Sequence, residues 1–336
     1  MGGQGVTAKG LDIVVISEVN PDLVITFTGD SIPFGQVETL LEGARLTVGG
    51  SGTIFACGAA RLGLRTAVVG LVGDDVFGQF MISELDRRGV LTDGIRRSPQ
   101  VATGVTVVID RSGRDRAILT YPGAMSLLGS KDLDNSLLEE ARHVHVSSIF
   151  LQRGIQEGLP SLLARVRASG GTTSLDPNWD PYGKWSVTLE PLLDVLDVLL
   201  PNENEAMALT GCATPLEAVA ALAQSVPQVV LKRGAKGAVE ASNGKLISVA
   251  APTGARVADT TGAGDSFDGG YLYGYLSGRP SEDRLRLAVA CGSLSTRTAG
   301  GTTSQATLAE AQTLANRLAA YAESPDIPGS SPGESS

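Results

Sequence analysis

DTTGAGDSF at residues 259–267 combines small residues and two carboxylates with the start of an amphipathic segment. Phe267 and the apolar residues after it recur at helical spacing, which predicts a helix that begins near Gly264 and runs toward Gly278. Gly262 and Gly264 let a ligand approach the main chain closely. The free N–H groups of a first helical turn favour negative charge. This stretch therefore predicts a helix start that binds a phosphoryl group.

Asp265 stands inside this cluster of hydrogen-bond donors. Phosphoryl transfer to a hydroxyl needs donors for the charge on the transferring group and an acceptor for the proton that leaves. We predict that Asp265 is this base and that it takes the proton late, as the new bond forms. The anion hole would consist of the amides of Gly262, Ala263 and Gly264. The alternative is that Asp265 only caps the helix, because aspartate is common at helix starts.

Two other phosphate-binding motifs do not fit this chain. The sequence contains no Gly-x-x-x-x-Gly-Lys-[Ser/Thr], so it is not a P-loop enzyme. Gly262 and Gly264 match the first two glycines of a dinucleotide fingerprint, but Phe267 stands where the third glycine should be. Too little chain follows for the βαβ halves that such a fold requires.

The composition narrows the class of protein. With 336 residues, the chain suits one large α/β domain with an accessory piece. A net charge of −9 disfavours nucleic acid as a partner. Three widely spaced cysteines indicate a reducing compartment. Because no leader pattern or membrane-length apolar run is present, we expect a soluble, cytoplasmic protein that does not bind membranes, with disordered tails at 1–9 and 324–336.

Strand and helix patterns alternate along the second half of the chain. This alternation predicts βαβ units and a largely parallel sheet, with ligands at the carboxyl ends of its strands. His143 and His145 share one face of a strand, where packing is favoured over a zinc site because no third ligand stands near. The strands are expected at 144–148, 172–175, 195–200 and 229–232, and the helices at 159–168, 216–226, 282–298 and 307–322.

Together with GGSGTIFACGAARLG at residues 49–63, the stretch at 259–267 resembles the signatures of the ribokinase-like sugar kinases, also called the PfkB carbohydrate kinase family. The resemblance implies one α/β domain over residues 11–322, with a largely parallel sheet flanked by helices on both faces. It also implies a small discontinuous β lid from about 20–48 and 100–122, the second part being a hairpin around Ser112-Gly113. Such a lid excludes water, so that ATP hydrolysis does not compete with sugar phosphorylation.

The activity that this resemblance implies is ATP- and Mg²⁺-dependent phosphorylation of a primary hydroxyl on a small sugar or sugar acid. The acceptor would contact Asp22, Gly49, Gly50 and Asp265. The residues implied for ATP are Asn202, Lys232, Gly234, Gly237, Gly262 and Gly264. Glu205 would handle Mg²⁺ through water, since Mg²⁺ keeps much of its water shell, although Asn202 and Glu205 also fit a capped helix start. Many family members hold a monovalent cation such as K⁺ near the backbone of Asp259 and Thr261.

The sequence departs from ribokinases in its first glycine-rich segment. Ser51 stands where ribokinases carry a lysine, and Ile54 where they carry an asparagine. Both changes remove polar contacts from the sugar pocket, which argues against ribose as the acceptor. Two alternatives stay open: a nucleoside kinase, in which Phe27 or Phe34 would stack a base, and a sugar-binding regulator without turnover. The exposed edges of the lid also allow a homodimer through the lid.

Overall fold

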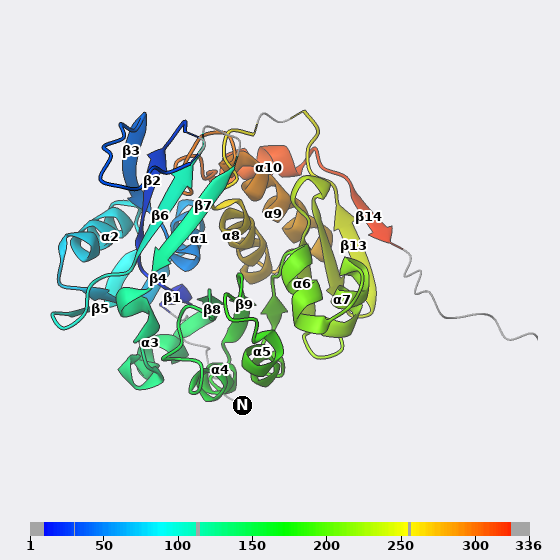
Figure 1. Ribbon diagram of the computed structural model, residues 1–336. Helices are drawn as coiled ribbons and strands as arrows, with labels where there is room; N and C mark the ends of the chain where they lie inside the picture. The colour runs from blue at the N-terminus through cyan, green and yellow to red at the C-terminus, as the bar shows by residue number, and fades with distance from the viewer. Residues whose placement is uncertain (1–9, 30, 112–114, 255–256, 324–336) are drawn as a thin grey trace, which may run out of the picture.

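The structure is a computed structural model, and its described residues are 10–29, 31–111, 115–254 and 257–323 (Figure 1). Three of the sequence predictions fall outside these ranges. They are the disordered tails at 1–9 and 324–336 and the hairpin turn around Ser112-Gly113. None of the helices in the described ranges is long and apolar enough to cross a membrane.

A long mixed sheet forms the centre of the molecule. Within the described residues its ten strands follow the order β14 (Ala320–Glu323), β13 (Lys245–Val249), β12 (Ala238–Ser242), β11 (Gln228–Lys232), β10 (Val198–Leu199), β9 (Thr172–Asp176), β8 (Ala141–Ser147), β1 (Leu11–Ile16), β4 (Thr66–Gly73) and β5 (Leu91–Ser98). Neighbouring strands from β11 to β5 pair in parallel. The remaining strands, β12 to β14, add an antiparallel edge. The prediction of a largely parallel sheet is confirmed.

Helices cover both faces of this sheet. Alternate residues of β1 show the reason: Val14 and Ile16 join the core on one face, whereas Ile13 and Val15 join the core on the other. The first face carries α3 (Asn135–Glu139), α4 (Leu159–Ala168), α5 (Trp185–Leu193), α6 (Glu203–Thr210) and α7 (Pro215–Leu222). The second face carries α1 (Ser51–Arg61), α2 (Val76–Arg87), α8 (Ala263–Leu276) and α9 (Ser281–Ser295), with α10 (Leu308–Ala315) packed on α9.

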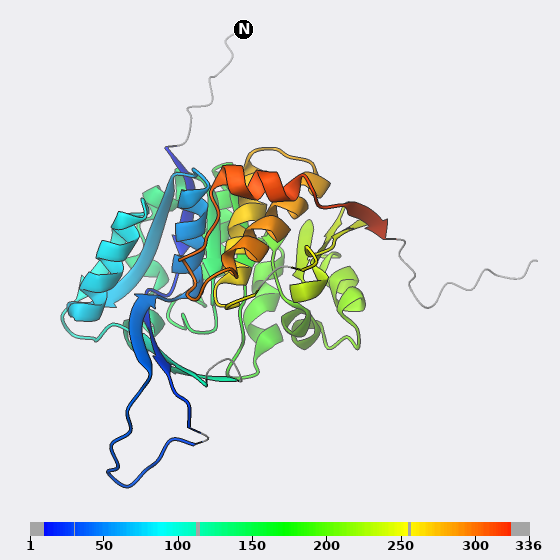
Figure 2. The same cartoon turned by 90° about the horizontal axis from the view of Figure 1, so that it is seen from above.

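A separate small sheet forms the lid. Its strands follow the order β3 (Gly43–Val48), β2 (Pro21–Thr26), β6 (Val105–Asp110) and β7 (Arg116–Tyr121). In Figure 2 the long connection between β2 and β3 extends away from the main sheet. The expected hairpin is present, since β6 and β7 pair antiparallel from Val105–Tyr121 to Asp110–Arg116. Because segments far apart in the sequence build this sheet, its position depends on tertiary packing.

Two sequence predictions in the sheet region are corrected by the structure. The helix expected at 307–322 is wrong in its second half, because α10 ends at Ala315 and β14 follows. Alanine-rich sequence favours a helix, but the open edge of β13 offers backbone partners, and Val249 pairs with Ala320 there. The strand expected at 195–200 shortens to β10. The edge strand β5 was not predicted, because its charged residues obscure the alternation of apolar and polar positions.

Candidate active site

The start of α8 has the geometry of an anion site. Gly262 adopts a left-handed conformation (φ 72°), and a Cβ at this position would lie 2.8 Å from the Cα of Gly301. Only glycine fits here. In the described part of the chain, no side chain caps this helix, and the amides of Gly262 and Gly264 have no acceptor. The third predicted donor differs, because the amide of Ala263 donates to the carbonyl oxygen of Thr260 at 3.2 Å.

Asp265 lies in the first turn of α8 and is partly buried. Its carboxylate caps no amide in the described residues, so the reading of Asp265 as a simple helix cap is not supported. Instead, the hydroxyl of Ser51 donates to Asp265 Oδ1. Burial and then the charge of Asp176 raise the pKa of Asp265 to about 8. A carboxylate with a raised pKa beside free amides is the combination that a proton acceptor in phosphoryl transfer needs.

Lys232 connects three elements beneath this helix start. Its Nζ donates to Asp176 Oδ2 at 2.8 Å and to Asp268 Oδ2 at 3.2 Å. A Cβ on Gly264 would lie 3.7 Å from the same Nζ, so the ammonium group packs directly against the anion site. Burial works against the charged form of Lys232, but the surrounding carboxylates raise its pKa overall. With a side chain only 12% exposed and two carboxylate partners, Lys232 could contact ATP only by sharing its hydrogen bonds.

Asn202 and Glu205 form the capped helix start that the sequence allowed. The side chain of Asn202 accepts from the amide of Glu205 at 3.0 Å, and Glu205 Oε2 accepts from the amide of Asn202 at 2.9 Å. The other carboxylate oxygen, Oε1, accepts from Asn202 Nδ2 at 2.6 Å. Burial and the charge of Asp176 raise the pKa of Glu205 to about 7. The capping role leaves room for an outer-shell contact with a hydrated metal.

Asp22 lies beside Gly49 of the glycine pair. A Cβ on Gly49 would lie 2.0 Å from Asp22 Oδ1, and Gly50 has a φ of 73°. Asp22 is buried, and this burial together with the charge of Glu18 raises its pKa to about 7. Glu18 was missed in the sequence analysis, although a carboxylate directly after a buried strand was a usable signal. Its Oε1 accepts from the amide of Ser51 at 2.6 Å.

Asn178 is a second residue that the sequence analysis did not assign. It follows β9 in a left-handed conformation (φ 55°). Its Nδ2 donates to Ser51 Oγ at 2.9 Å and to Ser148 Oγ at 3.1 Å. Ser148 is also left-handed, with a φ of 50°. Two residues with strained backbones follow neighbouring strands here. Such strain is typical of a functional site, where it places a side chain in a required position.

Asp259 holds the loop before α8 and meets the lid. Its carboxylate accepts from the amides of Thr261 and Gly300, each at 2.9 Å. From the lid strand β7, Arg116 donates to Asp259 Oδ1 at 3.3 Å and to Thr261 Oγ1 at 2.7 Å. Arg45 of β3 approaches the other oxygen of Asp259 at 4.0 Å. The lid is therefore bonded to the loop 259–262, here called the anion loop, through side chains that were not predicted from the sequence.

The loop from Lys232 to Gly237 makes a tight turn between β11 and β12. Both glycines have positive φ, 54° at Gly234 and 93° at Gly237. A Cβ on Gly237 would lie 1.9 Å from the carbonyl oxygen of Val249, so this glycine is required by the backbone itself. Within this loop it is Lys232 that reaches the start of α8, whereas Gly237 has a structural reason in the backbone.

Three apolar side chains discussed from the sequence have distinct positions. Ile54 is buried against the anion loop, since a Cβ on Gly262 would meet its Cγ2 at 2.9 Å. Phe27 is buried, whereas Phe34 is 91% exposed. Ile54 therefore packs the loop in place, and Phe27 is not presented to solvent as a stacking surface.

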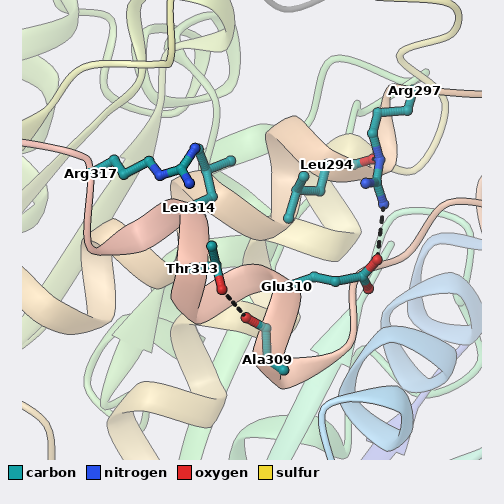
Figure 3. Close-up of a pocket in the computed structure, with 7 residues that line it drawn as sticks. All are labelled: Leu294, Arg297, Ala309, Glu310, Thr313, Leu314 and Arg317. Carbon is teal, nitrogen blue, oxygen red and sulfur yellow. Dashed lines mark hydrogen bonds and ion pairs between the residues drawn. The ribbon is translucent and has the colours of Figure 1, made fainter.

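A shallow pocket lies elsewhere, between α9 and α10. Figure 3 shows its lining, which combines Leu294 and Leu314 with Arg297, Glu310 and Arg317. Its volume is about 420 Å³. None of the predicted site residues lines it, so it is not part of the arrangement around Asp265.

Comparisons with known proteins cover most of the chain. The sequence matches the pfkB family carbohydrate kinases over residues 11–308. It is 30% identical over 231 residues to an uncharacterized sugar kinase from Archaeoglobus fulgidus, covering 68% of this chain and 90% of that protein. It is 31% identical over 283 residues to a fructokinase from Vibrio alginolyticus, covering 78% and 89%. A putative ribokinase II from E. coli in complex with ATP and Mg²⁺ has a TM-score of 0.79 at 27% identity, covering 91% of this chain and 99% of that chain.

Proposed function

Because this chain belongs to the pfkB family of carbohydrate kinases and is a sugar kinase, we propose that it transfers the γ-phosphoryl group of ATP to the primary hydroxyl of a small, neutral sugar. The observation that carries this proposal is the placement of Asp265 in the first turn of α8, beside the amides of Gly262 and Gly264, which have no acceptor within the described residues. A base and an anion site adjoin there, as the transfer requires.

The transfer itself needs little covalent chemistry from the protein. The acceptor hydroxyl donates to the carboxylate of Asp265. As its oxygen bonds to the γ-phosphorus, the bond from that phosphorus to the β–γ bridging oxygen breaks, and the proton passes to Asp265. ADP and the phosphorylated sugar result. The amides of Gly262 and Gly264 stabilise the charge on the transferring group, and Ala263 joins them only if its bond to Thr260 opens.

The nucleotide side of the site fits a hydrated magnesium ion. Both oxygens of Glu205 accept from Asn202, which favours contact through water over direct coordination. Nearby, Asp268 Oδ1 is buried without a hydrogen-bond partner among the described residues, and burial raises the pKa of Asp268, so an added cation would favour its ionised form. When bound, Mg²⁺ neutralises charge on the β- and γ-phosphates. We assign the ATP contacts to Asn202, Lys232, Gly234, Gly237, Gly262 and Gly264.

A monovalent cation beside the backbone of Asp259 and Thr261 remains part of the proposal. The bond from the amide of Gly300 to Asp259 Oδ2 brings two loops together there, at 2.9 Å. We expect K⁺ to order this loop and so to raise the rate of transfer. Equal rates in potassium chloride and in tetramethylammonium chloride at the same ionic strength would remove the cation from the proposal.

Electrostatics in the acceptor cradle favour a neutral sugar over a sugar acid. The cradle brings together the carboxyl groups of Glu18, Asp22 and Asp265. In addition to burial, the charge of Glu18 contributes to the raised pKa of both Asp22 and Asp265. The nearby ammonium of Lys232 is already bonded to two carboxylates. An acceptor with its own carboxylate would raise the pKa of these groups further and so disfavour the ionised Asp265 that takes the proton. Neutral hydroxyls can instead donate to these oxygens.

A coupled ADP-release assay tests the proposed function. The panel pairs each neutral sugar with the acid of the same carbon skeleton and includes nucleosides, and Asp265→Asn runs beside the parent protein. We expect one neutral sugar to raise ADP release and Asp265→Asn to lose it by several orders of magnitude. A nucleoside as the sole acceptor would replace the sugar proposal. A sugar that raises the melting temperature with no turnover would make the protein a sugar-binding regulator.

The lid supports a further part of the proposal, a homodimer. Strand β7 is exposed along its length, and Ile118, Leu119 and Tyr121 are each more than half exposed. An open strand edge with apolar side chains favours pairing with a second copy. Sedimentation of the full chain, with Leu119→Lys as the comparison, tests this.

A cytoplasmic location is likewise a proposal, for which fractionation of the source cells is the test.

A further inference from the structure

Ser51 is the centre of a chain of hydrogen bonds that ends on Asp265. Nδ2 of Asn178 donates to Ser51 Oγ at 2.9 Å, and Ser51 Oγ donates to Asp265 Oδ1. An amide NH₂ group can only donate, so Ser51 Oγ must accept on that side. Its own hydrogen is thereby directed to the carboxylate. The direction of both hydrogen bonds therefore follows from the side-chain amide of Asn178.

The frame around Ser51 leaves its hydroxyl little freedom. Its amide donates to Glu18 Oε1 at 2.6 Å, and the residue is the first of α1. On the other side, Asn178 is held in a left-handed conformation and also donates to Ser148 Oγ at 3.1 Å. Three segments, following β1, β9 and β8, thus converge on one serine. Such second contacts are what hold a reactive group in a defined orientation.

We propose that Ser51 is a positioning residue: its hydroxyl orients Asp265 and favours the ionised carboxylate, leaving Oδ2 to take the proton of the acceptor. This inference rests on the proposed kinase activity. In the described part of the chain no other side chain donates to Asp265, so the orientation of the base depends on this one bond. A serine in this role also accounts for the departure from the lysine of ribokinases at the same position.

Several charged groups face Asp265 and set the background for this role. The carboxylates of Asp176 from β9, Glu18 after β1 and Asp268 on α8 disfavour its ionised form, whereas the ammonium of Lys232 from β11 favours it. Burial is the largest influence and also disfavours ionisation. The hydrogen bond from Ser51 acts against burial. Removing this bond should therefore raise the pKa of Asp265.

The pH dependence of kcat/KM separates positioning from a purely structural role. Because the base must be ionised, the rate should rise with pH through the pKa of Asp265. We call this rise of kcat/KM with pH the limb. In Ser51→Ala we expect the limb to move up by about one pH unit, so that kcat/KM falls roughly tenfold near neutral pH and nearly recovers at pH values above the limb. Ser51→Thr keeps the hydroxyl and should keep the limb of the parent protein. Ser169→Ala, which removes an exposed hydroxyl at the end of α4 that donates only to backbone carbonyls in the described residues, is the matched control.

Asn178→Asp is an independent test of the hydrogen bonds from Asn178 to Ser51 and from Ser51 to Asp265. Aspartate tolerates the left-handed backbone, but its carboxylate would accept from Ser51 and so turn the hydroxyl away from Asp265. We expect a larger upward shift of the limb than in Asn178→Ala. A parent protein that phosphorylates no compound would contradict the proposed function. An active parent whose Ser51→Ala and Asn178→Asp variants lose rate equally at every pH would overturn the inference about Ser51.

Discussion

Arg116 in the lid donates to Thr261 Oγ1 at 2.7 Å and lies 3.3 Å from Asp259 Oδ1, directly before the anion site. This contact joins the small sheet to the loop that begins α8. Arg116 is 39% exposed in its side chain, so the contact contributes little to overall stability. Its effect should fall on closure of the lid over the reacting groups.

Arg116→Ala should therefore weaken coupling without unfolding the protein. We expect kcat/KM for the acceptor to fall by about tenfold, since a loosely closed lid misplaces the reacting groups. The fraction of ADP formed without phosphorylated sugar should rise, because water gains access. Quantifying ADP and sugar phosphate in the same reaction measures both effects. Arg45→Ala is the comparison, as its contact with Asp259 is 4.0 Å long and should matter less. Unchanged coupling in Arg116→Ala would argue against this role.

Lys232→Met should destabilise the fold strongly. It leaves Asp176 and Asp268 buried without their cation, and breaking a buried pair in this way costs about 3–5 kcal/mol. Urea unfolding measures the loss, which should shrink at acid pH because the carboxyl groups can then take up protons. Lys236→Met, at an exposed pair with Glu203, should change stability by less than about 1 kcal/mol. Equal effects of the two substitutions would contradict the buried network.

Asp265→Asn should make the protein more stable at alkaline pH. A carboxyl group whose pKa rises on folding, here to about 8, takes up a proton in the folded state, so its contribution to stability declines as pH rises toward that value. The amide does not titrate. The advantage of Asp265→Asn should therefore grow between pH 5 and pH 8, by at most about 1.4 kcal/mol per pH unit. Melting temperatures across this range provide the measurement. An advantage that shrinks with increasing pH would show that Asp265 is not held protonated by the fold.

Gly49→Ala should disrupt the proposed acceptor site. Its Cβ would lie 2.0 Å from Asp22 Oδ1 and 2.8 Å from the backbone nitrogen of Asp22, so the carboxylate and the adjoining backbone must both move. We expect KM for the sugar to rise by at least about tenfold, since a polar contact to the acceptor is lost. Gly43→Ala, at the other end of β3, would meet Thr26 with its nearest atom, Oγ1, at 3.6 Å and serves as the control. Similar KM values for both variants would place the acceptor elsewhere.

Sequence patterns predicted the elements whose signal is local. The helix after Gly262 and the strand and helix alternation from β8 onward follow from hydrophobic period and turn residues. The secondary structure was predicted wrongly where pairing with a neighbouring strand overrides the local preference of the residues. Residues 320–323 carry helix-forming alanine, yet the free edge of β13 draws them into a strand. The charged edge strand β5 had no clear period of its own.

At the candidate site, the motif, its glycines and the carboxylate of Asp265 could be predicted, because the helix start, the glycines and the predicted base are adjacent in sequence. The side chains that reach that carboxylate could not be predicted, because tertiary packing brings them there. Ser51 and Asn178 are 127 positions apart in sequence, and their bond exists only because the start of α1 meets the segment that follows β9. Arg116 reaches Thr261 across 145 positions for a related reason, the packing of the lid over the loop. Hydrogen bonds form between atoms that are close in space, and distance along the chain does not specify that closeness.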